Sequence, residues 1–270
     1  MRAGSVRPVL KVRLDALLTR RGLFASRSRA AASVMAGEVR VGPERRRAEK
    51  PGQLVPVDLP VAVEEAPRYA SRGGIKLANA LAATGLEVTG RRCLDVGAST
   101  GGFTDCLLQH GASRVVAVDV GYGDLDWRLR NHPRVTVRER LNARRLTPEA
   151  LPYRPDLIAV DVSFISLTKV LPAVLDCAAG RYDCLALCKP QFEVGRRRVG
   201  SGGVVREPHD RRTALLAVAG CAQRLGAAVI GFVPSGLPGP KGNVETFVWL
   251  GEAGRAGARD LQAAAREADP

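Results

Sequence analysis

Four charged side chains occupy positions at which an α/β fold would bring them together. Asp161 and Lys189 each follow a short apolar run, Glu245 opens a predicted strand, and Lys76 lies one turn into a predicted helix. Loops at the carboxyl ends of neighbouring parallel strands converge on one crevice, so we expect the four groups to meet there. Amines and carboxylates in such a crevice can remove a proton from a weak nucleophile or stabilise an anion that develops on it.

The same four groups also have a structural interpretation, in which two salt bridges close the edge of the sheet. A buried charge without a partner costs several kcal/mol, so two lysines and two acids would pair even in an inert protein. Metal binding is not expected, because the six cysteines form no CxxC pair and only three histidines are present. The residue types alone leave the catalytic and the structural interpretations open.

The segment LDVGASTGGF at 94–103 predicts a turn that holds a nucleoside cofactor. An apolar strand ends in Asp95, and glycines follow where backbone can approach a ligand before a helix begins. The glycines are Gly97, Gly101 and Gly102. A second strand ends in Asp119, sixteen residues after Phe103, where a carboxylate can accept hydrogen bonds from a ribose diol. Dinucleotide dehydrogenases use a related turn, but the acid before the first glycine and the spacing GASTGG favour S-adenosylmethionine.

The charge of the chain predicts a polyanionic partner, either nucleic acid or an acidic membrane surface. The 270 residues carry a net charge of +14, and the first 64 hold thirteen Lys or Arg against six Asp or Glu. A solvated basic surface without a partner is the alternative. No apolar run approaches the roughly 18 residues of a membrane span, and no signal peptide is visible, so we expect a soluble, cytoplasmic protein.

The first module, expected over residues 1–63, combines two short helices with small strands. Leucines within 14–18 share one helical face, Gly22 ends that helix, Ser26 caps the next helix, and 38–42 alternates as a strand. The segments RLDALL and SRSRAAASVMAGEVRVG resemble the RNA-binding module first recognised in ribosomal protein S-four. A generic two-helix appendage is the alternative.

The resemblance implies that arginines of this module contact RNA phosphates, which position a protein without reading bases. These arginines are Arg13, Arg27, Arg29 and Arg40.

A linker is expected at 64–71, followed by a second domain over 72–250 and a tail over 251–270. In the second domain, strands and helices alternate as in a doubly wound, Rossmann-like α/β sheet, and the last two strands lack a helix between them and should pair antiparallel. The expected strands are Arg92–Val96, Val115–Asp119, Val135–Arg138, Leu157–Asp161, Tyr182–Cys188, Ala228–Pro234 and Glu245–Leu250. The expected helices are Ile75–Thr84, Phe103–Gln109, Leu167–Ala178 and Arg211–Leu225.

From Tyr69 to Leu250 the chain resembles the FtsJ-type ribose methyltransferases, which have a class I methyltransferase sheet. It is more similar still to the TlyA family, in which the S-four-type module precedes that domain. Five motifs in order carry the resemblance: SRGGIKL at 71–77, LDVGASTGGFTDCLL at 94–108, VDVSFISL at 160–167, LCKPQFEVG at 187–195 and PGPKGNVE at 238–245. One departure is the pair Tyr69-Ala70 in the linker, where some members carry an aromatic residue followed by valine.

The resemblance implies a Lys-Asp-Lys-Glu tetrad that methylates an RNA 2′-hydroxyl, formed here by Lys76, Asp161, Lys189 and Glu245. The residues implied to bind S-adenosylmethionine are Asp95, Gly97, Ser99, Gly101, Gly102, Phe103, Asp119 and Asn142. We expect Lys189 to contact the hydroxyl, with help from the like charge of Lys76, while the two acids orient the amines.

The implied function is cytidine 2′-O-methylation of ribosomal RNA, in the large subunit and with the small subunit as a second candidate. Ribosomal RNA or a ribosomal subunit would be the partner, no membrane is involved, and we expect a monomer. Two alternatives are a membrane-active hemolysin, a label that this family also carries, and a non-catalytic RNA-binding factor of ribosome assembly. An aromatic content of only 4% and the absence of a membrane span disfavour the first, and an intact tetrad disfavours the second.

Overall fold

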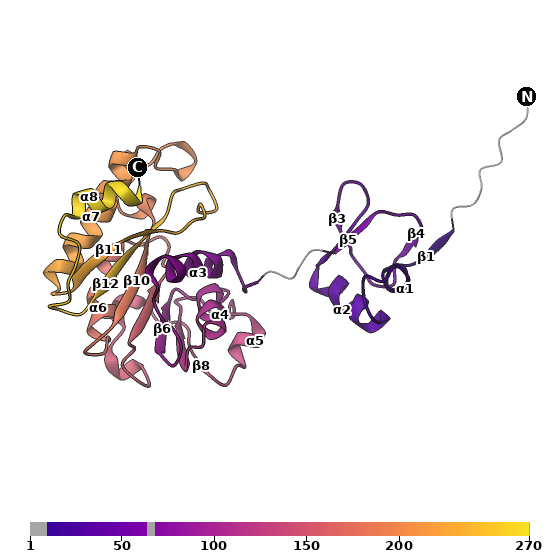
Figure 1. Cartoon of the computed structure of the whole chain (residues 1–270), viewed down its shortest axis with the longest axis horizontal. Helices are drawn as coiled ribbons and strands as arrows, with labels where there is room; N and C mark the ends of the chain where they lie inside the picture. Colours follow the sequence, from indigo (N-terminus) through magenta and orange to yellow (C-terminus); the bar gives the residue numbers. More distant parts are fainter. Residues whose placement is uncertain (1–9, 64–67, 270) are drawn as a thin grey trace, which may run out of the picture. The chain divides into compact units, whose positions relative to one another are not determined.

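The computed structural model describes residues 10–63 and 68–269, which belong to two compact units (Figure 1). The first unit is Met1–Arg68 and the second is Tyr69–Pro270. Residues 64–67 of the expected linker lie outside the described residues. Tyr69, which the sequence assigns to the linker, is 3% exposed and belongs to the core of the second unit.

The first unit packs two short helices against small antiparallel strands. The helices are α1 (Leu14–Arg20) and α2 (Arg27–Ala36), and the strands are β1 (Lys11–Arg13), β2 (Val39–Val41), β3 (Arg46–Arg47), β4 (Leu54–Pro56) and β5 (Val61–Val63). β1 pairs with β4, and β2 lies between β3 and β5. The predicted leucine face is fully buried, and the Ser26 hydroxyl accepts a hydrogen bond from the amide of Arg29 at the start of α2.

The second unit is built on a seven-stranded sheet, as the alternation of elements predicts. Its order is β11-β12-β10-β9-β6-β7-β8, and only β12 runs antiparallel to its neighbours. The strands are β6 (Arg92–Val96), β7 (Arg114–Val118), β8 (Val135–Arg138), β9 (Leu157–Val160), β10 (Asp183–Cys188), β11 (Ala228–Pro234) and β12 (Thr246–Gly251). The antiparallel pairing of the last two strands is confirmed.

Helices cover both faces of this sheet. The helices are α3 (Arg72–Thr84), α4 (Gly102–Gln109), α5 (Trp127–Arg130), α6 (Leu171–Asp176), α7 (Pro208–Arg224) and α8 (Leu261–Ala268). Side chains of α3 and α4 pack on one face and those of α6 and α7 on the other, because successive strand residues point to opposite sides. Within β6, for example, Cys93 faces α3 and α4 while Leu94 faces α6 and α7.

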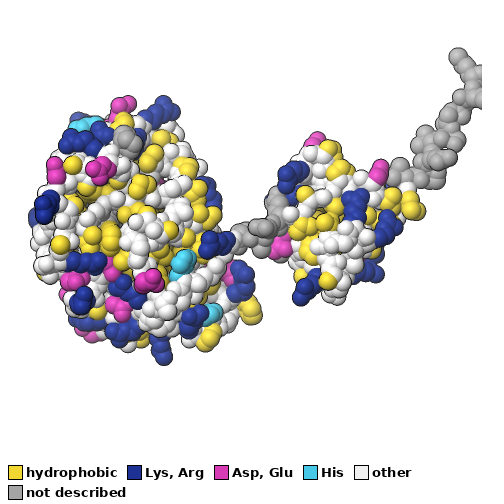
Figure 2. All heavy atoms as spheres, in the orientation of Figure 1, with side chains coloured by type: hydrophobic (Ala, Val, Ile, Leu, Met, Phe, Trp, Pro, Cys, Tyr) yellow, Lys and Arg dark blue, Asp and Glu magenta, His cyan; other side chains and the backbone are white. Residues whose placement is uncertain are grey.

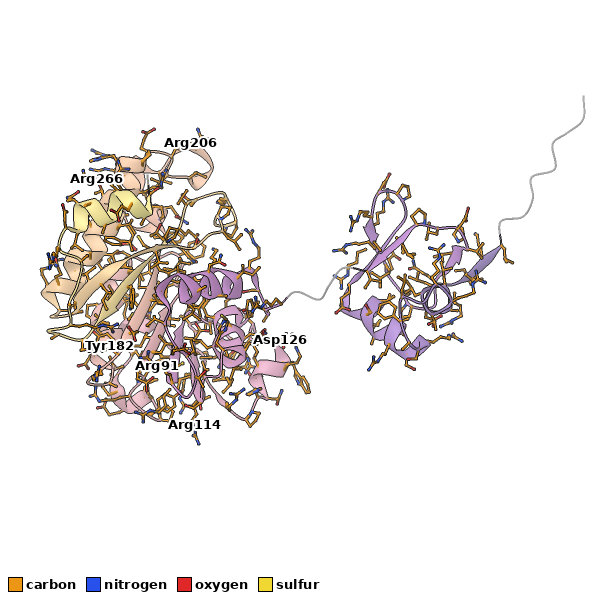
Figure 3. All side chains as sticks on the ribbon, in the orientation of Figure 1. Arg91, Arg114, Asp126, Tyr182, Arg206 and Arg266 are labelled. Carbon is orange, nitrogen blue, oxygen red and sulfur yellow. The ribbon has the colours of Figure 1, made fainter. Side chains whose placement is uncertain are left out.

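A network of ions closes the end of the sheet at which β10 begins. Asp183 accepts hydrogen bonds from Arg91 at 2.7 Å, from Arg255 at 2.6 Å and from the Trp249 indole at 2.9 Å. Burial opposes ionisation of Asp183, but these donors hold its pKa below the usual value. Figure 3 labels Arg91 and Tyr182 at this end of the sheet. The site described below lies at the opposite end of the strands.

The expected helix 167–178 and the expected tail 251–270 both differ from the structure. The predicted helix 167–178 is a 3-10 turn, η3 (Leu167–Lys169), followed by α6, because Pro172 has no amide hydrogen to continue a helix from η3. The predicted tail 251–270 contains α8, whose Ala265 is fully buried and which packs against α7 and β11. The Arg211 guanidinium also donates to Asp269 at 2.6 Å, so this segment is part of the folded unit.

No helix among residues 10–63 and 68–269 combines the length and the apolar character that a membrane crossing requires.

The start of α3 lies three residues before the predicted position, because the glycine pair at 73–74 forms its first turn and does not precede it. The Ser71 hydroxyl accepts from the amide of Gly73 and caps the helix. A Cβ on Gly74 would lie 2.4 Å from the Tyr69 side chain and 2.7 Å from the carbonyl oxygen of Gly102. Glycine therefore allows α3 and α4 to approach closely.

Replacing Gly74 by Ala is expected to destabilise the second unit by about 1–3 kcal/mol, because the added methyl group overpacks the contact between α3 and α4. Urea unfolding followed by circular dichroism measures the change. Gly180→Ala is the control, since its Cβ would meet nothing within 4 Å. A Gly74→Ala protein as stable as this control would contradict the close approach.

Candidate active site

The four charged residues singled out in the sequence lie at one end of the strands of the seven-stranded sheet. β9 and β10 are parallel, so Asp161 and Lys189 leave the sheet at the same end. β12 runs antiparallel to β10 with Thr246 opposite Cys188, which places Glu245 next to Lys189. Strand polarity therefore brings three of the groups together, and α3 supplies Lys76.

The four residues form two amine–carboxylate pairs. Lys76 Nζ lies 2.5 Å from Glu245 Oε2, and the two side chains are 8% and 1% exposed. Lys189 Nζ lies 2.5 Å from Asp161 Oδ1 and also donates a hydrogen bond to Ser163 Oγ at 2.9 Å. The Lys189 and Asp161 side chains are 11% and 21% exposed, so this second pair is the more accessible one. The pairing satisfies the buried charges, and it leaves the second pair within reach of a ligand.

Three adjoining pockets meet around the second pair. The first pocket, of about 450 Å³, is lined by the turn after β6 and by Asp161, and we call it the cofactor pocket because the sequence predicts that this turn holds the cofactor. The inner pocket, of about 250 Å³, contains Asp161 and Lys189 beside the same turn. The outer pocket, of about 400 Å³, contains Lys189 and Glu245. Lys189 thus lines the inner and the outer pocket, and its partner Asp161 also lines the cofactor pocket.

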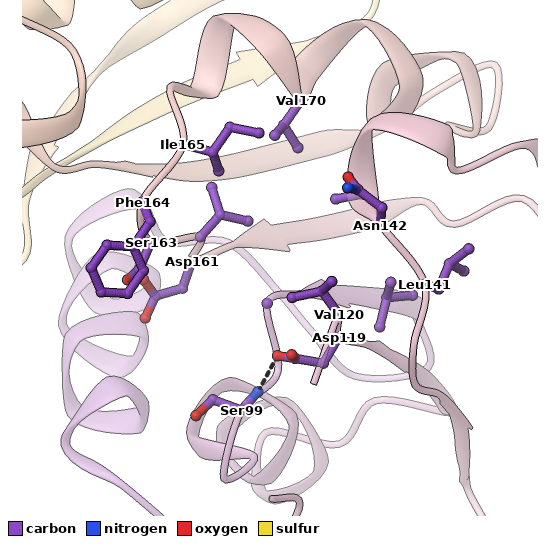
Figure 4. A pocket seen from close by; sticks show the side chains of 14 residues that line it. Ser99, Asp119, Val120, Leu141, Asn142, Asp161, Ser163, Phe164, Ile165 and Val170 are labelled. Atoms are coloured by element: carbon purple, nitrogen blue, oxygen red, sulfur yellow. Dashed lines mark hydrogen bonds between the residues drawn. The ribbon is translucent and has the colours of Figure 1, made fainter. Parts of the chain in front are cut away.

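The cofactor pocket combines polar and apolar side chains (Figure 4). Its polar groups include Ser99, Asp119 and Asn142, three of the residues that the sequence predicts to bind the cofactor. Its apolar lining includes Val120, Leu141, Ile165 and Val170. Apolar walls that can hold a flat base, together with a carboxylate that can accept from a ribose diol, match the chemistry of adenosine.

Asp119 is already fixed by backbone amides. Its Oδ2 accepts from the amide of Ser99 at 2.8 Å, drawn as a dashed line in Figure 4, and its Oδ1 accepts from the amide of Gly121 at 2.7 Å. A carboxylate has about four acceptor positions, so each oxygen can still accept one hydrogen bond from a ligand. The two amides hold the carboxylate in place before a ligand arrives.

Glycine is required at two positions of the turn by packing within the protein, whereas the sequence suggests that it is required by close approach of a ligand. A Cβ on Gly97 would lie 2.3 Å from the Asp161 carbonyl oxygen, and one on Gly101 would lie 2.3 Å from Leu129. Both residues also have φ near +90°, at 88° and 95°, a conformation that favours glycine. Gly97 and Gly102 line the pockets, but the immediate need for these glycines is close packing within the protein.

Asp95 lies under the turn and is 1% exposed. The sequence predicts that Asp95 contacts the cofactor, but a carboxylate buried in this way is not placed for a direct contact. Its Oδ2 accepts from the Thr104 amide at 2.9 Å and from the Thr104 hydroxyl at 2.7 Å. Burial raises its pKa to about 7, against the opposing effect of these hydrogen bonds. Asp95 thereby anchors the first turn of α4 below the pocket. Phe103, on that turn, lines the inner pocket.

Several residues around the site are absent from the sequence prediction. Phe164 is 92% exposed, and its backbone has φ 64°, an unusual conformation for a bulky residue. The centre of its ring lies 5.4 Å from the centre of the Phe192 ring. Both rings border a further pocket whose cations are Arg144, Lys169 and Arg196. The motif VDVSFISL contains Phe164, and the run RRR at 196–198 contains Arg196, so the sequence shows some of these aromatic and basic residues. Only the fold brings them beside Lys189.

In the first unit, two of the four predicted arginines share one acid. Asp15, 4% exposed, lies 2.7 Å from Arg13 and 3.3 Å from Arg27. The hydrogen bond from Arg13, with a further one from Arg27, holds the pKa of Asp15 below its usual value against the effect of burial. Arg29 is exposed, and Arg40 is partly buried on β2. Figure 2 shows Lys and Arg side chains spread over the visible face of each unit.

Comparison with protein families gives two matches. The model for FtsJ-like methyltransferases matches residues 69–252, and the model for the S4 domain matches residues 12–57.

Individual relatives span nearly the whole chain. The 16S/23S rRNA (cytidine-2′-O)-methyltransferase TlyA of Mycobacterium tuberculosis is 53% identical over 242 residues, covering 89% of this chain and 90% of that protein. A Bacillus subtilis protein named "Putative rRNA methyltransferase YqxC" is 43% identical over 90% of this chain and 87% of its own length. A solved structure named "Putative hemolysin from Streptococcus thermophilus" is 38% identical, covers 96% of both chains and superposes with a TM-score of 0.72.

Replacing Asp95 by Asn is expected to remove a pH-dependent contribution to stability. Because its pKa is about 7 in the folded protein, the folded state keeps a proton that the unfolded chain releases near pH 4. This stabilisation is complete below the unfolded-state pKa and is lost as pH rises through about 7. Asn remains neutral and can still accept from Thr104.

The free energy of unfolding of the wild type should therefore fall more than that of the Asn variant between about pH 5 and about pH 8. Urea unfolding of both proteins at the two pH values measures this difference. Parallel changes in the two proteins would contradict a raised pKa at Asp95.

Proposed function

The chain belongs to the FtsJ-like methyltransferases and, within them, to the TlyA family, and we propose that it methylates the 2′-hydroxyl of a cytidine in ribosomal RNA. The methyl donor of this family is S-adenosylmethionine. The observation that most supports the proposal is the pair of Lys189 and Asp161, because Asp161 lines the cofactor pocket while Lys189 lines the inner and the outer pocket beside it.

The reaction needs help at the nucleophile, because a ribose hydroxyl ionises far above neutral pH. When bound, S-adenosylmethionine supplies a methyl group on a positively charged sulfur. The new C–O bond would form as the S–C bond breaks and S-adenosylhomocysteine leaves, and the hydroxyl would lose its proton to Lys189 or to water. We propose that Lys189 assists this step, either by accepting the proton or by stabilising the developing alkoxide.

Of the other three members of the proposed tetrad, one contacts Lys189 and two pair with each other. Asp161 contacts the Lys189 amine directly, whereas Lys76 is held by Glu245, which lines the outer pocket with Lys189. The pairing seen here gives each amine one acid.

The region around the site also has the chemistry of an RNA-binding surface. Arg144, Lys169 and Arg196 offer three cations beside the outer pocket, and Phe164 presents an exposed ring on which a base could stack. Together with the S4 domain, these groups support an RNA substrate. In the described part of the chain, the four groups of the site come from one copy, so we propose that the monomer is the catalytic unit. We also propose that it acts in the cytoplasm, where ribosomal RNA is found.

The function is tested by incubating the protein with tritium-labelled S-adenosylmethionine and purified large subunits, small subunits or free ribosomal RNA. Label on the 2′-oxygen of a cytidine is the expected result, and mapping identifies the nucleotide and the subunit. RNA binding without transfer would indicate a non-catalytic assembly factor. Leakage of liposomes without transfer would indicate the membrane-active alternative.

Replacing Lys189 by Ala is expected to lower the rate of methyl transfer by about a hundredfold to ten-thousandfold, the range for loss of one acid–base group. Binding of S-adenosylmethionine, measured by calorimetry, and of RNA, measured by filter binding, should stay near that of the wild type. Arg224→Ala is the control, because this exposed arginine ends α7 at the opposite end of the sheet. Substantial activity of the Lys189 variant would refute its proposed role.

Replacing both Arg27 and Arg29 by Ala is expected to weaken RNA binding and to flatten its dependence on salt. Each lost phosphate contact reduces the slope of log K against log salt by about 0.7 to 0.9, so the double variant should lose about 1.5. Filter binding at several salt concentrations gives the slope, and Arg224→Ala again serves as the control. An unchanged slope would exclude these arginines from the RNA interface.

A further inference from the structure

Lys189 has a second partner that lies outside the tetrad. Its Nζ donates to Ser163 Oγ at 2.9 Å, in addition to the contact of 2.5 Å with Asp161 Oδ1. Both partners lie on the same short segment after β9, two residues apart. The loop that follows β9 therefore contacts the amine of Lys189 at two points.

The two contacts act differently on the amine. The amine nitrogen has three positions besides its bond to carbon, occupied by hydrogens in the charged form and by two hydrogens and a lone pair in the neutral form. Asp161 Oδ1 forms an ion pair with the amine but accepts no hydrogen bond from it, so this contact does not fix the directions of the three positions. The hydrogen bond to Ser163 Oγ fixes one of the positions, and the tetrahedral geometry of the nitrogen then fixes the directions of the positions that remain free.

The place of Ser163 matches this role. It lines the cofactor pocket, the inner pocket and the outer pocket, and it is the one residue that the three have in common among those that line them. Figure 4 shows Ser163 on the same strand end as Asp161. The amine that it orients thus lies where the three cavities meet.

We propose that Ser163 is a positioning residue for methyl transfer, whose hydroxyl aims the free position of the Lys189 amine at the reacting hydroxyl. This inference rests on the proposed function. In both forms of the mechanism the direction matters, because a lone pair must face the proton that it accepts and an N–H must face the anion that it stabilises. A misplacement of about 1 Å in such a group can cost on the order of a hundredfold in rate.

Ser163 also permits a clean substitution. Its side chain is exposed, so removing the hydroxyl leaves no buried cavity, and Ala is expected to fold normally. Thr keeps the hydroxyl and adds one methyl group. Ser113 is a control, because its hydroxyl donates to the Arg91 carbonyl just before β6, at the end of the sheet opposite the site.

The test compares Ser163→Ala, Ser163→Thr and Ser113→Ala with the wild type under saturating S-adenosylmethionine. We expect kcat of Ser163→Ala to fall about tenfold to a hundredfold, while KM for RNA and the Kd of S-adenosylmethionine stay within about twofold. Ser163→Thr should recover most of the lost rate, and Ser113→Ala should match the wild type.

A measurement without turnover separates this inference from the proposed function. In protein labelled with ¹⁵N-lysine, the Lys189 amine, identified by its loss in Lys189→Ala, should exchange its hydrogens more rapidly in Ser163→Ala than in the wild type. Unchanged exchange would overturn the positioning role whether or not the protein transfers methyl groups. An unchanged kcat in an active enzyme would overturn it too, as would a rise in KM that accounts for the whole loss, or a Thr variant no better than Ala. Absence of transfer by the wild type would instead refute the proposed function.

Discussion

The need to pair buried charge is the constraint on which the active end of this protein depends. Lys76 and Glu245 are almost fully buried, and neither would be tolerated there alone, since breaking a buried pair typically costs about 3–5 kcal/mol. Their contact ties α3 to the segment that precedes β12, and the contact of Lys189 with Asp161 ties the end of β10 to the end of β9. The same contacts that stabilise this end of the sheet therefore also assemble the four groups that we propose to act on the substrate.

In the turn after β6, residues that line the cofactor pocket or lie beneath it also stabilise the local structure. Gly97 and Gly101 relieve contacts within the protein, and Asp95 anchors α4 from below through Thr104. Asp119 is held by two backbone amides and keeps acceptor positions for a ligand. A rigid turn places the polar groups of the pocket in advance, which reduces the entropy that binding would otherwise lose.

Much of this arrangement was predictable from local sequence patterns, and the exceptions have identifiable causes. The strands β6, β8 and β11 have the predicted bounds, because their apolar residues and flanking turns are strong local signals. The helix expected over 167–178 is divided at Val170, just before Pro172 in the first turn of α6, and α8 is missed because an alanine-rich helix gains its stability from packing on α7 and β11. Tyr69 looks like part of a linker in sequence, yet Gly74 leaves the space into which it packs.

By itself the sequence determined the alternation of strands and helices and the residue types at the strand ends. Hydrophobic periodicity and strand polarity are local properties, and they are enough to bring Asp161, Lys189 and Glu245 to one end of a sheet. Only the tertiary structure decided that Lys76 pairs with Glu245, 169 residues away, and that Lys189 is held by both Asp161 and Ser163. Which charge meets which depends on the strand order and on the packing of α3, and no local pattern encodes either.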